Sequence, residues 1–238
     1  MHTEEIRYSD GDLTCIGYLA SPGKSEKPVP GVLICHAWGG RSPFECDKAE
    51  KFAGLGVAGF ALDIYGEARQ GSSPEENATL MQPFLDDRAA LRQRLQAGLA
   101  ALTQRPEVDS EKLIAVGYCF GGLCVLDLAR SGANLKGVIS YHGLFVPAEG
   151  IPNEKIRAKV LALHGHEDPM VPPEQVLAFE QEMTQSGADW QVHAYGNTYH
   201  AFTNPQANDP DMGVLYNADA DRRSWETTLN FLKECFAL

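Results

Sequence analysis

The sequence lacks the features of secreted and membrane proteins. Its first residues contain neither a basic cluster nor an apolar run, so we expect no secretory signal. No apolar stretch approaches the ~20 residues that a membrane-spanning helix needs. The six cysteines are scattered and form no C-x-x-C pair, which argues against a disulfide framework in a chain of this length. These absences predict a cytoplasmic protein.

Basic residues are also scarce. The chain has 20 lysines and arginines against 32 aspartates and glutamates, a formal net charge of -12. A protein of this sign repels phosphate backbones and anionic lipid surfaces, so we expect neither nucleic acid nor membrane as a partner. A length of 238 residues with a hydrophobic share of 44% suits one globular domain over residues 1–238. The expected partner is a small-molecule substrate, and the sequence leaves a monomer and a homodimer both open.

Apolar runs and helical patterns alternate along the chain. Residues 6–8 and 13–20 flank a Ser-Asp-Gly-Asp turn, which predicts an antiparallel hairpin. Further strands are predicted at 32–35, 57–64, 113–116, 138–139, 160–163 and 190–195, and helical patterns at 46–55, 74–104, 120–130, 173–187 and 225–236. This order predicts an α/β fold with a mostly parallel central sheet, helices on both faces and an N-terminal antiparallel hairpin.

One motif stands where such folds place their chemistry, just after a strand. Residues 117–122 read Gly-Tyr-Cys-Phe-Gly-Gly, which is the G-x-S-x-G nucleophile elbow with cysteine in place of serine. Small flanking residues allow a sharp turn that exposes the Cys119 sulfur at a helix N-terminus, whose partial positive charge favours a thiolate. Most free cysteines are small buried hydrophobes, and that interpretation suits Cys15, Cys35 and Cys235. For Cys119 the glycine spacing favours a nucleophile.

A thiol nucleophile needs a base, and the base needs an orienting acid. His200 lies in a loop directly after a predicted strand, where this fold places its histidine. Asp168 is the predicted acid, with the neighbouring Glu167 as its rival. His164 and His166 in the same loop suggest a metal site, but no third ligand has convincing spacing, so we expect no metal and no other cofactor.

Two backbone N–H groups are predicted to hold an oxyanion. Phe120 follows the nucleophile, and Ala37 lies in a His-Ala-Trp-Gly-Gly loop similar to the H-G-G-G type that supplies this donor. His36 has two open roles: it could hold this loop by hydrogen bonds, or face the pocket and tune Cys119.

Three motifs, taken in order, resemble those of the dienelactone hydrolase family. They are Gly-Tyr-Cys-Phe-Gly-Gly at 117–122, His-Glu-Asp-Pro at 166–169 and Tyr-His-Ala-Phe at 199–202. The resemblance runs over nearly the whole chain. It implies an α/β-hydrolase fold with no large cap domain, and a triad of Cys119, His200 and Asp168.

The sequence departs from this family at charged positions. Enzymes of the family carry a glutamate that helps to activate the thiol where this chain has His36, and an arginine for the substrate carboxylate where it has Asn204. A second carboxylate-binding arginine has no clear match near 75–77. Without these cations a carboxylate-bearing lactone loses a charge-assisted anchor, so we expect neutral substrates. The expected pocket lining is His36, Trp38, Tyr118, Phe120, His142 and Tyr199.

Together these features predict a metal-free hydrolase that cleaves neutral carboxylic esters or lactones through a cysteine-acyl intermediate. A trigonal-bipyramidal phosphorus centre fits the same oxyanion pocket, so promiscuous hydrolysis of phosphotriesters is a second expectation. The alternatives are carboxymethylenebutenolidase-type dienelactone hydrolysis, thioester hydrolysis, acyl transfer to another acceptor, and a non-catalytic ligand-binding scaffold. The loops at 65–83 and 203–219 are expected to shape the pocket.

Overall fold

The computed structural model describes residues 1–23 and 27–237, which divide into two compact units, Met1–Val116 and Gly117–Leu238. The fifth strand, β5 (Val108–Tyr118), begins in the first unit and ends in the second. Each unit consists of strands covered by helices, as the α/β pattern predicted. The prediction of one domain over residues 1–238 stays a prediction.

The first unit opens with the predicted antiparallel hairpin. Its strands are β1 (His2–Asp10), β2 (Leu13–Ser21), β3 (Val29–Cys35) and β4 (Ala58–Ala61), in the spatial order β1-β2-β4-β3. The β1–β2 and β2–β4 pairs are antiparallel, whereas β3 and β4 are parallel. The residues of β3 from Gly31 to Cys35 and all those of β4 are buried, which explains why both strands read as apolar runs.

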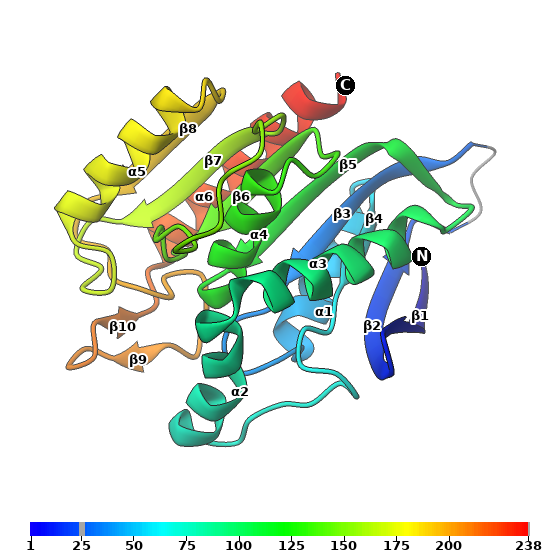
Figure 1. Ribbon diagram of the computed structural model, residues 1–238, viewed down its shortest axis with the longest axis horizontal. Helices are drawn as coiled ribbons and strands as arrows, with labels where there is room; N and C mark the ends of the chain where they lie inside the picture. The colour runs from blue at the N-terminus through cyan, green and yellow to red at the C-terminus, as the bar shows by residue number, and fades with distance from the viewer. Residues whose placement is uncertain (24–26, 238) are drawn as a thin grey trace. The chain divides into compact units, whose positions relative to one another are not determined.

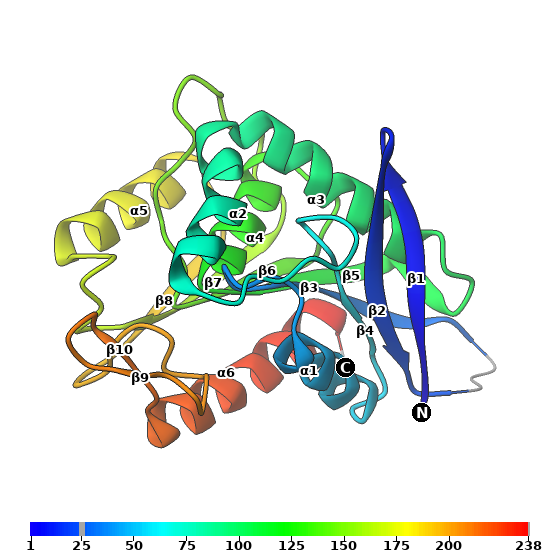
Figure 2. The same ribbon diagram turned by 90° about the horizontal axis from the view of Figure 1, so that it is seen from below.

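Three helices belong to the first unit: α1 (Pro43–Ala53), α2 (Pro74–Asp86) and α3 (Arg88–Thr103). Figure 2 shows α1 and α3 on opposite faces of β3 and β4. Helix α1 starts three residues before its predicted start because Ser42 and Glu45 form a capping box. The Glu45 carboxylate accepts the Ser42 N–H, and the Ser42 hydroxyl accepts the N–H of Phe44 in the first turn.

The second unit contains three parallel strands in the order β6 (Gly137–Tyr141), β7 (Lys159–Gly165) and β8 (Trp190–Tyr195). Helices α4 (Phe120–Arg130) and α5 (Pro173–Gln185) cover one face of these strands, and α6 (Ala218–Phe236) covers the other (Figures 1 and 2). Because the strands run in parallel, their carboxyl ends and the loops that follow them lie at one edge. Among the described residues no separate cap domain interrupts this arrangement.

Two predicted segments were wrong in detail. The helical pattern at 74–104 is two helices, because the chain leaves the helical conformation at Asp87 after α2. The Asp87 side chain then accepts the N–H of Ala90 and so caps the start of α3. The segment 203–219, predicted as a loop, holds the short antiparallel strands β9 (Asn208–Asp209) and β10 (Val214–Leu215).

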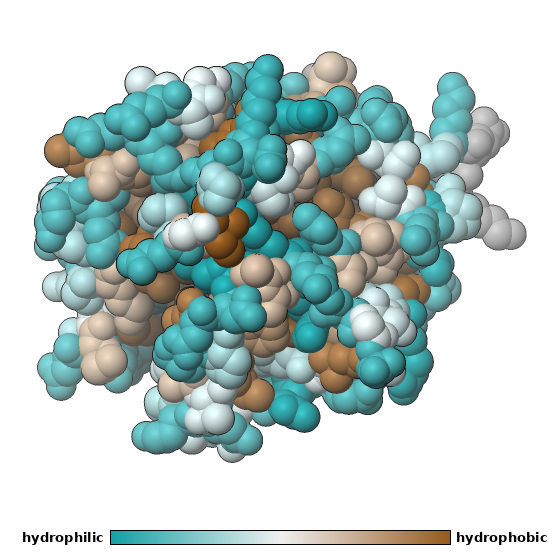
Figure 3. Space-filling view, viewed as in Figure 1, coloured by the Kyte–Doolittle hydropathy of each residue, from teal (hydrophilic) through white to brown (hydrophobic). Residues whose placement is uncertain are grey.

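The surface agrees with the low hydropathy of the chain. On the face shown in Figure 3, hydrophilic residues predominate over α5, and hydrophobic residues show there only as isolated spots. In the part of the chain that the structure describes, no helix combines the length and the apolar character that crossing a bilayer requires. The cytoplasmic location stays a prediction.

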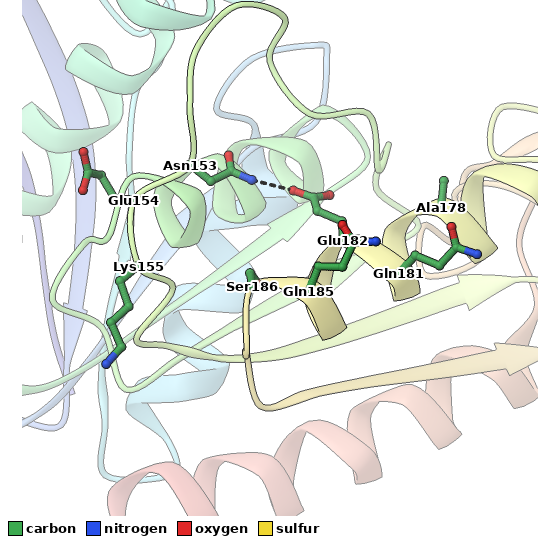
Figure 4. Close-up of a pocket in the computed structure, with 8 residues that line it drawn as sticks. All are labelled: Asn153, Glu154, Lys155, Ala178, Gln181, Glu182, Gln185 and Ser186. Carbon is green, nitrogen blue, oxygen red and sulfur yellow. Dashed lines mark hydrogen bonds between the residues drawn. The ribbon is translucent and has the colours of Figure 1, made fainter.

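A buried arginine joins α4 to α5. Arg130 is fully buried, and its Nε and Nη2 donate to the two carboxylate oxygens of Glu182 at 2.8 and 2.7 Å. Nη2 also donates to the Phe145 carbonyl at 2.7 Å. Asn153 donates to the same Glu182 carboxylate at 2.8 Å, on the wall of a surface cavity (Figure 4). Two carboxylates therefore compensate the charge of Arg130: Glu182 through two hydrogen bonds, and the buried Asp127, whose Oδ1 lies 3.5 Å from Nη1.

We expect Glu182→Gln to lower the free energy of unfolding by about 3 kcal/mol, because it removes the bidentate partner of a buried cation. Glu180→Gln, on the same helix and outside this network, is the matched control and should change stability by less than about 0.5 kcal/mol. Urea denaturation followed by circular dichroism measures both. Equal effects of the two substitutions would contradict the role given to Glu182.

Candidate active site

The nucleophile elbow has the sharp turn that the motif predicted. Cys119 lies between β5 and α4 with φ 56° and ψ -115°, a conformation that residues with a side chain rarely adopt. A Cβ atom at Gly117 would stand 1.9 Å from the Gly121 carbonyl oxygen, so only glycine fits there. The predicted steric reason for a glycine at position 117 is confirmed.

The backbone around Cys119 is held on both sides. Its N–H donates to the Tyr141 carbonyl at 3.0 Å and also to Nδ1 of His142 at 3.2 Å. Its carbonyl accepts the Gly122 N–H at 2.9 Å. The Cys119 side chain is half-buried and adjoins Phe120, the first residue of α4. A helix N-terminus at this point favours negative charge on the sulfur or on a bound oxyanion.

His200 is held in place by a short stretch of strand-like pairing. Its N–H donates to Gly213 at 2.9 Å and its carbonyl accepts from Leu215 at 3.1 Å. The loop that carries it includes two non-glycine residues at positive φ, Asn197 and Ala201. The β10 segment, which the sequence did not predict, thus fixes the backbone of the proposed base.

Asp168 binds the predicted base directly. Nδ1 of His200 lies 2.7 Å from Oδ2 of Asp168, and both side chains are almost fully buried. The other carboxylate oxygen accepts the Met170 N–H at 2.9 Å. Glu167, the rival acid, is exposed. The two loops approach so closely that a Cβ at Gly165 would stand 2.5 Å from the Tyr199 carbonyl. The structure therefore pairs His200 with Asp168, as the sequence predicted.

The electrostatics of this pair favour a charged imidazole. Burial lowers the pKa of His200, but the charge of Cys119 and the hydrogen bond with Asp168 outweigh it and raise the pKa to about 10. His200 therefore carries a proton at neutral pH when Cys119 is a thiolate. Burial also acts on His164 at the end of β7, where it lowers the pKa. This second histidine is neutral under the same conditions.

The loop after β3 lies in the first unit. Nε2 of His36 accepts the Ile64 N–H at 3.2 Å, so Nδ1 carries the proton and donates to the Ala37 carbonyl at 2.7 Å. The side chain is fully buried, and burial lowers its pKa. Of the two roles left open for His36, the structure supports the one that holds the loop. The Ala37 N–H donates to the Glu45 carboxylate at 3.3 Å.

The residues of the predicted pocket lining differ in exposure. Trp38 and Tyr199 are each 36% exposed and can contact a substrate. His36, Tyr118 and His142 are only 0, 1 and 2% exposed, and Phe120 is also fully buried. Ring contacts and hydrogen bonds occupy part of the surfaces of His36, Tyr118 and His142, for instance the stacking of Tyr118 on Tyr141 at 4.8 Å. Their burial leaves little surface for a substrate, and their place in the pocket lining stays a prediction.

Two buried side chains that bond to predicted site residues were missed from the sequence. Glu45 is buried beside Ala37, and the Ser42-x-x-Glu45 capping pattern could have revealed its position. Thr203 is buried and binds His142 at 2.9 Å, and no sequence signal announces that contact. Asn204 is part-exposed and brings no positive charge, as its residue type implies.

Comparisons with known proteins agree with the motifs. A model described as the dienelactone hydrolase family matches residues 16–236. The chain is 43% identical to an uncharacterised Caenorhabditis elegans protein over 155 residues, which are 64% of this chain and 98% of that protein. A Yersinia pestis protein with the provisional name carboxymethylenebutenolidase is 24% identical over 91% of this chain and 82% of its own length.

Similar solved structures are also described as dienelactone hydrolases or as dienelactone hydrolase-like. A dienelactone hydrolase-like promiscuous phosphotriesterase from metagenomic libraries is similar with a TM-score of 0.94 and 36% identity, covering 99% of this chain and 98% of that one. A Klebsiella pneumoniae structure with the provisional name dienelactone hydrolase is 20% identical and has a TM-score of 0.78 over 98% of this chain and 99% of its own, which shows the shared fold.

We expect Cys119→Ala to lower the pKa of His200 from its value of about 10, because the substitution removes the negative charge that raises it. In the variant Asp168 alone opposes the lowering of the His200 pKa by burial, so the ring should lose its proton at a lower pH than in the wild type. NMR titration of the imidazole resonances measures this difference. An unchanged titration of His200 would argue against a thiolate–imidazolium pair.

Proposed function

Because the chain belongs to the dienelactone hydrolase family and is therefore a hydrolase of ester bonds, we propose that it cleaves neutral carboxylic esters and lactones through a cysteine-acyl intermediate. The observation that carries this proposal is the pairing of His200 with Asp168 at 2.7 Å, beside a cysteine at a strained strand–helix turn. This arrangement supplies the nucleophile, the base and the orienting acid that acyl transfer requires.

The proposed reaction begins with the Cys119 thiolate. The sulfur attacks the carbonyl carbon, and the carbonyl oxygen becomes an oxyanion near the N-terminus of α4, where the Phe120 N–H is the predicted donor. When the tetrahedral intermediate collapses, the bond to the leaving oxygen breaks, and His200 gives its proton to that oxygen. The products of this half-reaction are an alcohol and an acyl-cysteine.

The second half-reaction returns the enzyme to its starting state. Neutral His200 takes a proton from water, and the resulting hydroxide attacks the acyl carbon. Collapse of the second intermediate releases a carboxylic acid and the thiolate, which again faces a protonated His200. Asp168 keeps the ring oriented and stabilises its charge in both halves. Ala37 as the second oxyanion donor stays a prediction from the motif, and in this structure its N–H donates to the Glu45 carboxylate.

The choice of neutral substrates follows from the charged groups present. Asn204 stands where the family carries an arginine, and the segment 75–77 offers glutamates instead of a cation. A carboxylate-bearing lactone would find no charge-assisted bond at either position. Carboxymethylenebutenolidase-type hydrolysis, the activity named for several relatives, is therefore the alternative substrate class. Thioester hydrolysis and acyl transfer share the same acyl-enzyme.

A second candidate activity is hydrolysis of neutral phosphotriesters. The structural relative with 36% identity over nearly the whole chain is described as a promiscuous phosphotriesterase. In this reaction the Cys119 sulfur would attack phosphorus, the aryl oxygen would leave with the His200 proton, and water would then cleave the phosphorus–sulfur bond.

We expect intact-mass spectrometry of the protein after brief exposure to p-nitrophenyl butyrate to show one added butyryl group in the wild type and none in Cys119→Ala. The rate of p-nitrophenol release in steady state should fall by about 10³-fold or more in that variant. Cys46→Ala is the matched control, since this cysteine is also half-buried but lies outside the site. Full activity in Cys119→Ala would overturn the proposal.

For the phosphotriester activity, diethyl p-nitrophenyl phosphate is the probe. We expect a diethylphosphoryl adduct on Cys119 and slow release of p-nitrophenol that the Cys119→Ala substitution abolishes. Release at the same rate in wild type and Cys119→Ala would remove this second activity while leaving ester hydrolysis to be judged by the first assay.

A further inference from the structure

We infer that His142 is a positioning residue that ties the nucleophile turn to the loop of the base, and so sets how Cys119 and His200 face each other. This inference rests on the proposed function, because it concerns the same cysteine and histidine. His142 directly follows β6 and is only 2% exposed. It contacts both reacting partners without being one of them.

The contacts of His142 run in two directions. On one side Nδ1 accepts the N–H of Cys119 at 3.2 Å. On the other side Nε2 lies 2.9 Å from the hydroxyl oxygen of Thr203, three residues after His200. The His142 ring also meets His200 edge to face, with ring centroids 5.2 Å apart, and meets Phe202 in the same manner at 5.1 Å. One imidazole thus spans the two loops.

These contacts define the protonation state of His142. Nδ1 accepts a hydrogen bond from a backbone N–H, so it carries no proton. The proton must then be on Nε2, which donates to the Thr203 hydroxyl. A second proton on Nδ1 would break the bond to Cys119 and place a cation against the charged ring of His200. The site therefore holds His142 as a neutral imidazole.

The backbone supports a positional role. His142 has φ 38°, in the left-handed region that a residue with a side chain enters at a cost of order 1–3 kcal/mol. Its N–H donates to the Leu163 carbonyl of β7 at 2.8 Å, which holds this conformation. Strain of this kind persists only where surrounding contacts fix it, and here it directs the ring between the two loops.

The titratable groups around His142 come from four segments. Tyr118 ends β5 and Cys119 follows it, Tyr141 ends β6, and His200 lies in the loop after β8. Beyond His200 are Asp168 and the neutral His164. In this set, His142 is the imidazole that bonds to the backbone of the nucleophile. Through these contacts it helps to set how the sulfur faces His200, in addition to the bond between His200 and Asp168.

The test uses substitutions that break the bridge at the bond between His142 and Thr203. His142→Asn keeps an acceptor for the Cys119 N–H, tolerates positive φ and cannot reach Thr203. Thr203→Val removes the hydroxyl at similar size, and Thr203→Ser restores it. His193→Asn, on β8 and outside these contacts, makes the same chemical change elsewhere and is the control.

The first measurement is the pH profile of Cys119 alkylation by iodoacetamide, followed at its peptide by mass spectrometry. We expect Thr203→Val and His142→Asn to shift the profile to higher pH and to slow alkylation at neutral pH about tenfold, the size of a one-unit change. Thr203→Ser and His193→Asn should keep the wild-type profile. Profiles that stay unchanged in Thr203→Val and His142→Asn overturn the inference, even if thermal stability falls.

The second measurement is ester turnover. We expect kcat to fall roughly 10- to 100-fold in Thr203→Val with KM within about twofold, and the double variant with His142→Asn to be no worse than His142→Asn alone, because both break one bond. Additive losses of kcat in the double variant would overturn the inference that the two substitutions break the same bond. Alkylation needs no ester, so an absence of Cys119-dependent turnover in the wild type overturns the proposed function, whereas an unshifted alkylation profile overturns the role of His142.

Discussion

The site depends on a cysteine held in a backbone conformation that most residues avoid. At φ 56° and ψ -115°, Cys119 carries a strain of order 1–3 kcal/mol, and the structure maintains it through bonds to the Tyr141 carbonyl and the Gly122 N–H. The position of the sulfur is therefore set by the main chain. Its partners have to be brought to that point from other loops, and this explains why the His200 backbone is paired with Gly213 and Leu215 and not left in a free loop.

Features that follow from local rules could be predicted from the sequence. Buried parallel strands read as apolar runs, and their carboxyl ends lie at one edge of the sheet. Residues directly after each run were therefore the natural candidates for the active site. The elbow at Cys119, the family and the pairing of His200 with Asp168 agree with that reasoning. Helix α4 matches its predicted bounds because glycines and a strand fix its start.

Features that depend on side-chain direction could not be predicted. A histidine after a strand can point into a pocket or into the core, and nothing in its neighbours along the chain decides between them. His36 and His142 both point inward, where hydrogen bonds to backbone groups far away in the sequence fix their rings. The short strand β10 was missed for a similar reason, since two residues show no periodicity and their pairing depends on the distant His200.

Charge balance links the protonation states to the choice of substrate. In the resting state that we propose, the Cys119 thiolate and the Asp168 carboxylate flank one imidazolium, so this buried group carries one negative charge in excess. His142 and His164 add no positive charge, because hydrogen bonding keeps the first neutral and burial lowers the pKa of the second. A substrate carboxylate would bring a further negative charge into the same low-dielectric surroundings. Family members offset that charge with arginines, and this chain has Asn204 at one of those positions. The negative charge of the triad is therefore a second argument for the proposed preference for neutral esters, in addition to the missing cations.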